Sequence, residues 1–317
     1  MFVLAHLSDP HLGPLPAVRP TQLLSKRILG VMNWNRHRRH NLGPSTLHLL
    51  LEDLKAQEPN HVSVTGDLAN VSLPGEFATG AAFLRELGSP EHVSMVPGNH
   101  DVYVRSTRHL HLEQWGAYLT GDGANGPADA ETFPYVRRRG PVALVGLSTA
   151  VPTAPFMASG WVGTRQLQHL ARILDELGQE GVFRVVMLHH PPVGQQSWHR
   201  RLRDAAAVRH VLVQAGAELV LHGHEHKACL EHISLLSAEA GEGIPVVGVP
   251  SAAAGPRVSA KAGGYALYRI SGQLGAWRCE MERRGFGPGH EGQSAKVQSL
   301  SRSFILGAPA PDVMSRL

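Results

Sequence analysis

The chain has 317 residues, 43% of them hydrophobic and 18% charged, which is enough apolar material for one large domain with a sizeable core. A formal net charge of +4 and only 6% aromatic residues argue against a polybasic, base-stacking nucleic-acid tract along the chain. Two cysteines are too few for a disulfide-rich secreted protein, and no apolar stretch is long enough for a signal peptide or a membrane span, so we expect a cytoplasmic protein.

Short apolar runs of strand length alternate with helical periods, which indicates an α/β layered fold. The runs are rich in Val, Leu and Ile, as strands buried on both faces are. Between them, apolar residues three and four apart predict helices that begin near Ser or Thr and end at glycines. The last third is rich in predicted strands, so we expect a mixed sheet or a second sheet. We predict strands within 2–9, 61–67, 92–101, 142–149, 183–192, 217–226, 244–251, 265–270 and 275–282, and helices within 45–57, 77–88, 164–178 and 204–216.

Two segments interrupt this pattern within a domain that we place at 1–284. Residues 14–44 are long for a connection between a strand and its helix, and they combine an apolar helical stripe with a basic cluster that includes Lys26, Arg27, Arg36, Arg38 and Arg39. We expect a helical insert. Four roles are compatible with it: packing on the domain, a lid over a bulky or lipid-like substrate, contact with an anionic membrane surface, and dimerisation. The segment 285–317 is rich in Gly, Ser and Pro, and we expect a partly irregular tail.

Polar side chains gather where the predicted strands end, which is where α/β sheets form their binding sites. The motifs are "DPH" (9–11), "GD" (66–67), "GNHD" (98–101), "HHPP" (189–192) and "GHEH" (223–226). In an extended segment, residues two apart face the same way, so D-x-H and H-x-H each direct two donors into one cavity. Each motif alone is equally compatible with a turn, a cap or a surface pair. Their order, each behind an apolar strand, indicates a metal site for Mn, Fe or Zn rather than copper.

These five motifs, in this order, resemble the signature of the calcineurin-like metallophosphoesterase superfamily over residues 1 to about 270. "HLSDPHLG" and "HHPP" resemble the branch that includes bacterial class III cyclic-nucleotide phosphodiesterases and glycerophosphodiesterases. The resemblance implies a four-layer α/β/β/α β-sandwich, with two mixed sheets flanked by helices, here with a helical insertion after the first strand.

The resemblance also implies two metal ions and a role for each motif residue. Asp9, His11 and His226 would hold one ion. Asn99, His189 and His224 would hold the other, and Asp67 would bridge them. His100 would act as the general acid that protonates the leaving oxygen, and Asp101 would orient it. His190 and His222 have no ligand role in the pattern.

The implied activity is hydrolysis of a small-molecule phosphate ester by a hydroxide held between the two ions, with a phosphodiester expected rather than a monoester. Arg201 and Arg203 are candidates for holding a second anionic group, although a solvated helix start also explains them. The alternatives are a metal-dependent nuclease, a lipid-linked phosphoesterase or pyrophosphatase whose insert holds an acyl substrate, and a scaffold without activity. A homodimer is compatible with the sequence.

Overall fold

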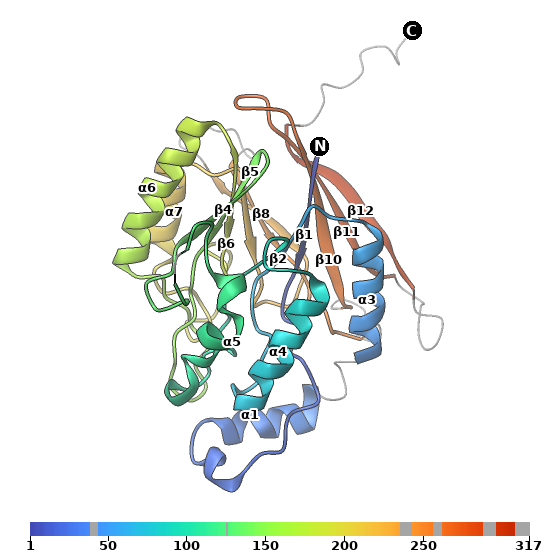
Figure 1. Ribbon diagram of the computed structural model, residues 1–317, viewed down its shortest axis with the longest axis vertical. Helices are drawn as coiled ribbons and strands as arrows, with labels where there is room; N and C mark the ends of the chain where they lie inside the picture. Colours follow the sequence, from blue (N-terminus) through green and yellow to red (C-terminus); the bar gives the residue numbers. More distant parts are fainter. Residues whose placement is uncertain (39–43, 125, 235–242, 256–261, 288–295, 308–317) are drawn as a thin grey trace.

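The computed structural model describes residues 1–38, 44–124, 126–234, 243–255, 262–287 and 296–307. Its strands form two six-stranded mixed sheets that pack face to face, with helices on both outer faces (Figure 1). This architecture confirms the predicted fold class.

The first sheet has the order β12-β11-β10-β1-β2-β3, and the second has the order β4-β5-β6-β7-β9-β8. Parallel pairing joins β1 to β2 and β3, and β5 to β6, β7 and β9, so the carboxyl ends of the strands within each set lie at one edge. The strands are β1 (Phe2–Leu7), β2 (His61–Val64), β3 (Val93–Met95), β4 (Tyr135–Arg139), β5 (Val142–Gly146), β6 (Phe183–Met187), β7 (Leu219–His222), β8 (Cys229–Ser234), β9 (Gly243–Gly248), β10 (Gly264–Ser271), β11 (Arg278–Phe286) and β12 (Val297–Leu306).

Two hydrophobic clusters hold the layers together. The larger one fills the space between the sheets and continues to the first sheet's outer helices, where Leu50 of α3 and Phe77 of α4 are fully buried. The smaller one packs the second sheet against Leu174 of α6 and Leu212 of α7. The helices are α1 (Arg27–Asn33), α3 (Pro44–Ala56), α4 (Pro74–Leu87), α5 (Leu110–Leu119), α6 (Thr164–Glu180) and α7 (Ala205–Ala215), with short helical turns η1 (Pro20–Leu23), η2 (Trp34–Arg38) and η3 (Arg105–Thr107). None of the helices in the described ranges combines the length and apolarity that a membrane crossing requires.

The helix ends differ from the predicted ones at two places. α4 begins at Pro74 rather than near Phe77, because the buried Glu76 carboxylate accepts hydrogen bonds from the backbone N–H groups that precede the helix. α6 continues past Gly178, the predicted end, and stops at Gly181, whose φ of 71° suits glycine. Gly178 lies inside α6, where a Cβ would come within 2.8 Å of the Arg184 guanidinium.

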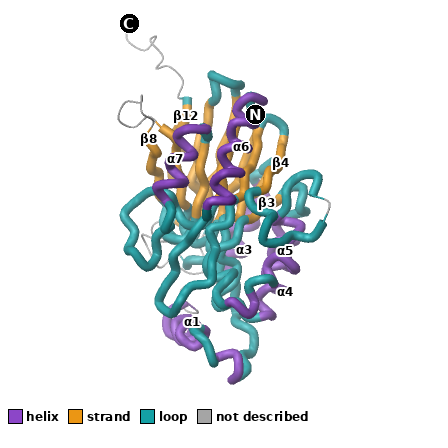
Figure 2. Tube along the Cα trace, turned by 90° about the vertical axis from the view of Figure 1, so that its left-hand side faces the viewer, coloured by secondary structure: helices purple, strands orange, loops and turns teal. Residues whose placement is uncertain are grey.

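The insert consists of η1, α1 and η2, and lies at the end of the molecule where the loops gather below the strands (Figure 2). Arg27, which the sequence placed in a basic cluster, is 5% exposed and anchors α1: its side chain donates hydrogen bonds to the carbonyls of Val71 and Ser72 and to Thr107 Oγ1. Residues 39–43, including Arg39, lie outside the described residues.

The last strand, β12, lies within the segment expected to be partly irregular. It pairs antiparallel with β11 at the edge of the first sheet. Its register with β11 shifts at two places, which fits an edge strand with mostly exposed side chains. The tail prediction for residues 288–295 and 308–317 lies outside the described residues.

An ion-pair network ties α3 to the outer face of the first sheet. Arg284 on β11 bonds both carboxylate oxygens of Asp53 at 2.8 Å and Glu282 Oε1 at 2.8 Å, and Tyr265 Oη donates to Asp53 Oδ2 at 2.5 Å. Burial alone would raise the pKa of Glu282, but hydrogen bonds from Arg269 and Arg284 lower it to about 2. Both carboxylates therefore stay charged, and Arg284 is the partner that they share.

We expect Arg284→Met to lower the free energy of unfolding by about 2 kcal/mol, because it leaves two largely buried carboxylates without their shared partner. Urea denaturation at pH 7 measures the change. Arg302→Met is the matched control, since Arg302 lies on the neighbouring strand, its side chain is 51% exposed beside Glu280, and it approaches Glu282 only to 3.9 Å. The control should lose less than about 1 kcal/mol. Equal losses in the two variants would contradict a specific role for Arg284.

Candidate metal centre

The loops that follow β1, β2, β3, β6 and β7 meet at one end of the sandwich and bring together the residues of all five sequence motifs. Most histidine and aspartate side chains from these loops are almost completely buried there, with Asp9, Asp67 and His189 at 1% exposure or less, whereas His100 and His226 are partly exposed. Three of the loops come from the first sheet and two from the second. The centre therefore lies across the junction of the two sheets.

We expected an extended backbone at the D-x-H and H-x-H motifs, but the backbone at this centre is not extended. Five of its non-glycine residues have positive φ: Asp9 (52°), His11 (41°), Asp67 (57°), His224 (69°) and His226 (54°). This left-handed conformation costs an L-residue about 1 kcal/mol or more, so the surrounding structure must hold it in place. For Asp9 and His11, two hydrogen bonds of 3.0 Å do so, from their N–H groups to the carbonyls of Gly66 and Asp67.

A first donor group consists of Asp9, His11, Asp67 and His226, whose ligand atoms lie within 4.8 Å of one another. His226 Nε2 is 3.1 Å from Asp9 Oδ1 and 3.2 Å from His11 Nε2. His11 Nδ1 donates to the carbonyl of Ala69, so the neutral ring directs the lone pair of Nε2 into the group. Within the described residues, the buried Asp9 Oδ1 has no hydrogen-bond partner and faces two imidazole nitrogens, His226 Nε2 at 3.1 Å and His11 Nε2 at 4.0 Å. These converging lone pairs fit a cation.

A second donor group consists of Asn99, His189 and His224. Asn99 Oδ1 lies 3.2 Å from His189 Nε2 and 3.0 Å from His224 Nδ1. The other ring nitrogens donate to backbone carbonyls, His189 Nδ1 to Thr65 at 2.6 Å and His224 Nε2 to Arg200 at 3.0 Å. Such bonds fix the tautomer of metal-binding histidines. This donor set of an amide oxygen and two imidazoles also fits a metal ion.

Asp67 lies between the two donor groups. Its Oδ2 is 3.8 Å from His11 Nε2 in the first group and 3.4 Å from His189 Nε2 in the second. Burial alone would raise the pKa of Asp67, but the charges of His189 and His100 hold it well below its usual value. Burial alone would lower the pKa of His189, but the charge of the Asp67 carboxylate raises it to about 9. The two groups are thus coupled through one charged carboxylate.

His190 of the "HHPP" motif and His222, which directly precedes "GHEH", have other partners. His190 lies close enough to His189 and His224 to join a metal group, but both of its ring nitrogens are engaged, with Thr149 Oγ1 at 2.8 Å and the Ala158 carbonyl at 3.0 Å. His222 Nδ1 donates to the Gly223 carbonyl, and its Nε2 faces Cys229 Sγ at 3.6 Å. Burial lowers the pKa of His190 to about 3 and that of His222 to about 4, so both rings are neutral.

The motif glycines allow the loops to approach one another. A Cβ on Gly98 would lie 2.2 Å from Asp67 Oδ1, and a Cβ on Gly223 would lie 2.6 Å from Asp9 Oδ2. Any side chain at either position would displace an aspartate of the centre. The glycine requirement therefore comes from a neighbouring loop rather than from the turn that carries the glycine.

His100 borders the centre and is partly exposed. Its backbone N–H donates to Asp67 Oδ1 at 2.7 Å, and its Nδ1 donates to the Asn70 carbonyl at 2.5 Å. The ring stacks on Tyr103 with centroids 5.4 Å apart, and Lys26 Nζ lies 4.2 Å from the centroid of the Tyr103 ring. The sequence analysis placed Lys26 only in the basic cluster of the insert and did not single out Tyr103, because neither belongs to a motif and the two residues meet only in the folded chain.

Asp101 was expected to orient His100, and the structure gives its carboxylate backbone partners. It accepts hydrogen bonds from the N–H groups of Asp67 and Gly98 at 2.8 Å and of Ala69 at 2.9 Å. These bonds join the loop after β2 to the loop after β3. Burial, followed by the charge of Asp67, raises the pKa of Asp101 to about 7. An influence of Asp101 on His100 would pass through this loop pair.

The arginines of "HRRLR" lie at the rim. Arg201 is exposed, and Arg203 donates to the Gly160 carbonyl and lies over the Trp161 ring. Arg200, which was not among the two substrate-binding candidates, is closer to the second donor group: its Nη2 donates to the His224 carbonyl at 3.1 Å. Residue spacing alone does not separate these three arginines, because they lie in an irregular loop.

Comparison with known proteins adds family information. A family model described as calcineurin-like phosphoesterase matches residues 2–228, more than half of the chain. A dimetal phosphatase from Danio rerio is 14% identical with a TM-score of 0.59, over 95% of this chain and 99% of that one. A purple acid phosphatase, PPD1, from seeds of yellow lupin (Lupinus luteus) is 13% identical with a TM-score of 0.52, over 94% of this chain and 53% of that one. No curated protein matches the sequence significantly. At these identities the two structures show a shared fold.

Proposed function

Because the chain belongs to the calcineurin-like phosphoesterase family, we propose that it hydrolyses phosphate esters at a centre for two metal ions. The observation that carries this proposal is the position of Asp67, whose Oδ2 lies 3.8 Å and 3.4 Å from ring nitrogens of two separate donor groups. A single carboxylate between two such groups suits a pair of ions that share one ligand.

We assign Asp9, His11 and His226 to one ion, Asn99, His189 and His224 to the other, and Asp67 to both. When bound, such ions act as Lewis acids toward phosphoryl oxygens and lower the pKa of a water toward neutrality. The oxygen and imidazole donors suit Mn, Fe or Zn. Bonds from ring nitrogens to the carbonyls of Ala69, Thr65 and Arg200 keep three of the four histidines, His11, His189 and His224, in the tautomers that this role requires.

His100 would supply the proton to the leaving oxygen. Its Nδ1 is committed to the Asn70 carbonyl, so Nε2 is the atom at which the proton would be held and passed on. Stacking on Tyr103 and the backbone bond to Asp67 fix the ring beside the first donor group, 5.0 Å between its centroid and that of His11. The residue is thereby oriented before substrate arrives.

A phosphodiester is the preferred substrate in this proposal. Its phosphoryl group carries one negative charge, which needs fewer cationic side chains than a monoester dianion. In the loop at residues 200–203, Arg200 borders the second donor group, whereas Arg203 is engaged by Gly160 and Trp161, so this loop offers limited cationic clamping. The resemblance of "HLSDPHLG" and "HHPP" to the phosphodiesterase branch supports the same choice.

The cytoplasmic location stays a prediction.

Metal removal tests the proposal. We expect chelation to abolish hydrolysis of bis-p-nitrophenyl phosphate and Mn²⁺ to restore it, with p-nitrophenyl phosphate cleaved at least about tenfold more slowly in kcat/KM, a difference of about 1.4 kcal/mol in transition-state stabilisation. A preference for the monoester would move the assignment to a phosphatase. Hydrolysis that is unaffected by complete metal removal would contradict the metal centre itself.

A further inference from the structure

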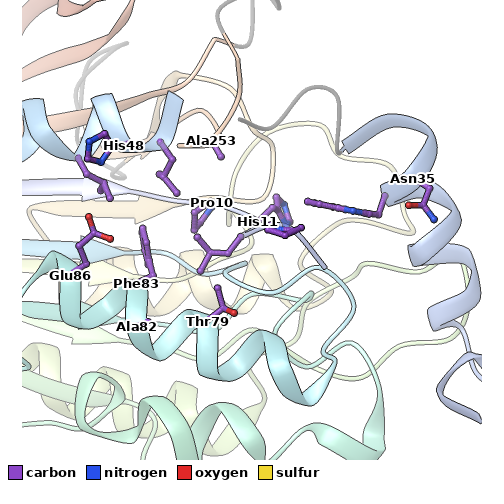
Figure 3. A pocket seen from close by; sticks show the side chains of 15 residues that line it. Pro10, His11, Asn35, His48, Thr79, Ala82, Phe83, Glu86 and Ala253 are labelled. Atoms are coloured by element: carbon purple, nitrogen blue, oxygen red, sulfur yellow. The ribbon is translucent and has the colours of Figure 1, made fainter. Parts of the chain in front are cut away.

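A cavity of about 580 Å³ opens beside the first donor group (Figure 3). Pro10 and His11 form part of its wall, so it begins at the loop that carries two of the proposed metal ligands. From there it continues between α3, which contributes Leu47 and Leu51, and α4, which contributes Phe83. Its volume falls in the range of small-molecule binding sites.

The interior of this cavity is apolar and its far end is polar. Trp34, Leu47, Leu51 and Phe83 in the wall are themselves buried. The polar side chains of His48 and Glu86 lie at the end opposite Asn35, with Pro10 and His11 between the two ends (Figure 3). The His48 and Glu86 side chains are 64% and 50% exposed, so this end faces solvent. The α4 part of the wall, from Thr79 to Glu86, runs for about 10 Å.

The insert separates this cavity from a second one of about 370 Å³. Trp34 lines the first cavity and packs against Gly13, where a Cβ would lie 2.6 Å from its ring. Met32 and Arg36 line the second, together with His100 and Tyr103. One cavity therefore adjoins His11 and is apolar, while the other adjoins the proposed general acid and has a cation at its edge.

A phosphodiester has two ester groups, and these two cavities offer each of them a different place. The leaving group must lie next to His100 to receive a proton, so it belongs in the second cavity. The group that stays on phosphorus then points toward the first cavity, whose buried wall offers no compensation for a charged or strongly polar occupant.

We propose that the first cavity binds a hydrocarbon chain carried by the ester group that stays on phosphorus, so that the substrate is an amphiphilic phosphoester. This inference rests on the proposed phosphoester hydrolysis. It explains why an apolar cavity with a solvent-facing far end directly adjoins a strongly polar centre. It also assigns a task to the insert, whose Trp34 closes the wall nearest to the metal ligands.

Alkyl p-nitrophenyl phosphates with methyl, butyl and octyl chains test the proposal below their micelle-forming concentrations, because p-nitrophenolate leaves and the alkyl group stays on phosphorus. Each buried methylene group should tighten binding about threefold to fourfold. Allowing for partial burial, we expect the KM of the octyl ester to lie at least about 20-fold below that of the butyl ester, with similar kcat.

Ala82→Trp should fill the cavity, since Ala82 is an exposed residue of α4 that lines it. The variant should keep the wild-type KM for the methyl ester and lose the advantage of the octyl ester. Thr79→Trp is a second filling variant of the same kind. Ala78→Trp is the control, because Ala78 is exposed on the same helix and does not line the cavity. The control should behave as wild type, and thermal melting confirms that each variant folds.

The outcomes separate this inference from the function on which it rests. Hydrolysis of all three esters with equal KM, or an octyl preference that survives both filling variants, would overturn the cavity proposal and leave phosphodiester hydrolysis intact. Hydrolysis of none would overturn the proposed function. In that case calorimetry with octyl phosphate and ethyl phosphate still decides about the cavity: tighter binding of octyl phosphate that Ala82→Trp abolishes supports it, and equal binding contradicts it.

Discussion

Asp67→Asn is expected to remove both metal ions and to reduce kcat/KM on bis-p-nitrophenyl phosphate by at least about three orders of magnitude. The amide keeps the shape of the carboxylate but not its charge. Asp67 Oδ2 is the acceptor that faces both His11 and His189, so each donor group loses its shared anion. Loss at one position alone would mean that Asp67 is not a bridge.

Metal content by mass spectrometry and steady-state kinetics measure this effect together. Asp175→Asn is a suitable control, because Asp175 is an exposed residue of α6 that belongs to none of the motifs. It removes the same charge from the same chain and should leave metal content and kcat/KM unchanged. If Asp67→Asn instead retained two ions and wild-type turnover, the assignment of the whole centre would fail.

His100→Asn is expected to retain both ions and to slow turnover in a way that depends on the leaving group. General acids typically contribute about 100-fold to 10,000-fold, and the contribution is largest when the leaving oxygen is strongly basic. Hydrolysis of a dialkyl phosphate should therefore fall by about that factor, while bis-p-nitrophenyl phosphate, whose leaving group needs little protonation, should lose far less.

A series of esters with leaving groups of increasing basicity makes this prediction quantitative. The rate of the variant should decline more steeply along the series than that of the wild type. A merely structural role of His100 would lower all rates by one factor and would not change the slope. His210→Asn, at an exposed position on α7, controls for the loss of an imidazole elsewhere. Wild-type hydrolysis of an alkyl ester by His100→Asn would contradict the general-acid role.

The sequence predicted the fold class and the convergence of the motifs because both depend on short-range patterns. Apolar runs ending in polar residues mark strand ends, and parallel strands bring their carboxyl ends to one edge. The conformation within each motif was not predictable in this way. An extended D-x-H was the simplest geometry, whereas Asp9 and His11 adopt left-handed backbone held by the loop after β2. That loop is more than fifty residues away in the sequence.

Long-range packing also accounts for the other differences. Gly178 resembled a helix end, but it is a glycine because Arg184 approaches α6. Arg27 resembled part of a solvated basic face, but it is buried against the carbonyls of Val71 and Ser72. In each case the role of the residue depends on a contact with a distant segment. The periodicity of the local sequence gives no information about such a contact.

The position of β1 in the first sheet has a consequence for the chain during its synthesis. β1 lies between β2 and β10, and its antiparallel partner β10 begins only at Gly264. At about 5 to 20 residues per second, a ribosome needs roughly 15 to 50 seconds to reach that partner after β1 has been made. During this interval the nascent polypeptide presents one edge of an apolar strand, FVLAHL, without its neighbour. The segment that precedes Asp9 is therefore one that we expect to need protection by chaperones while translation continues.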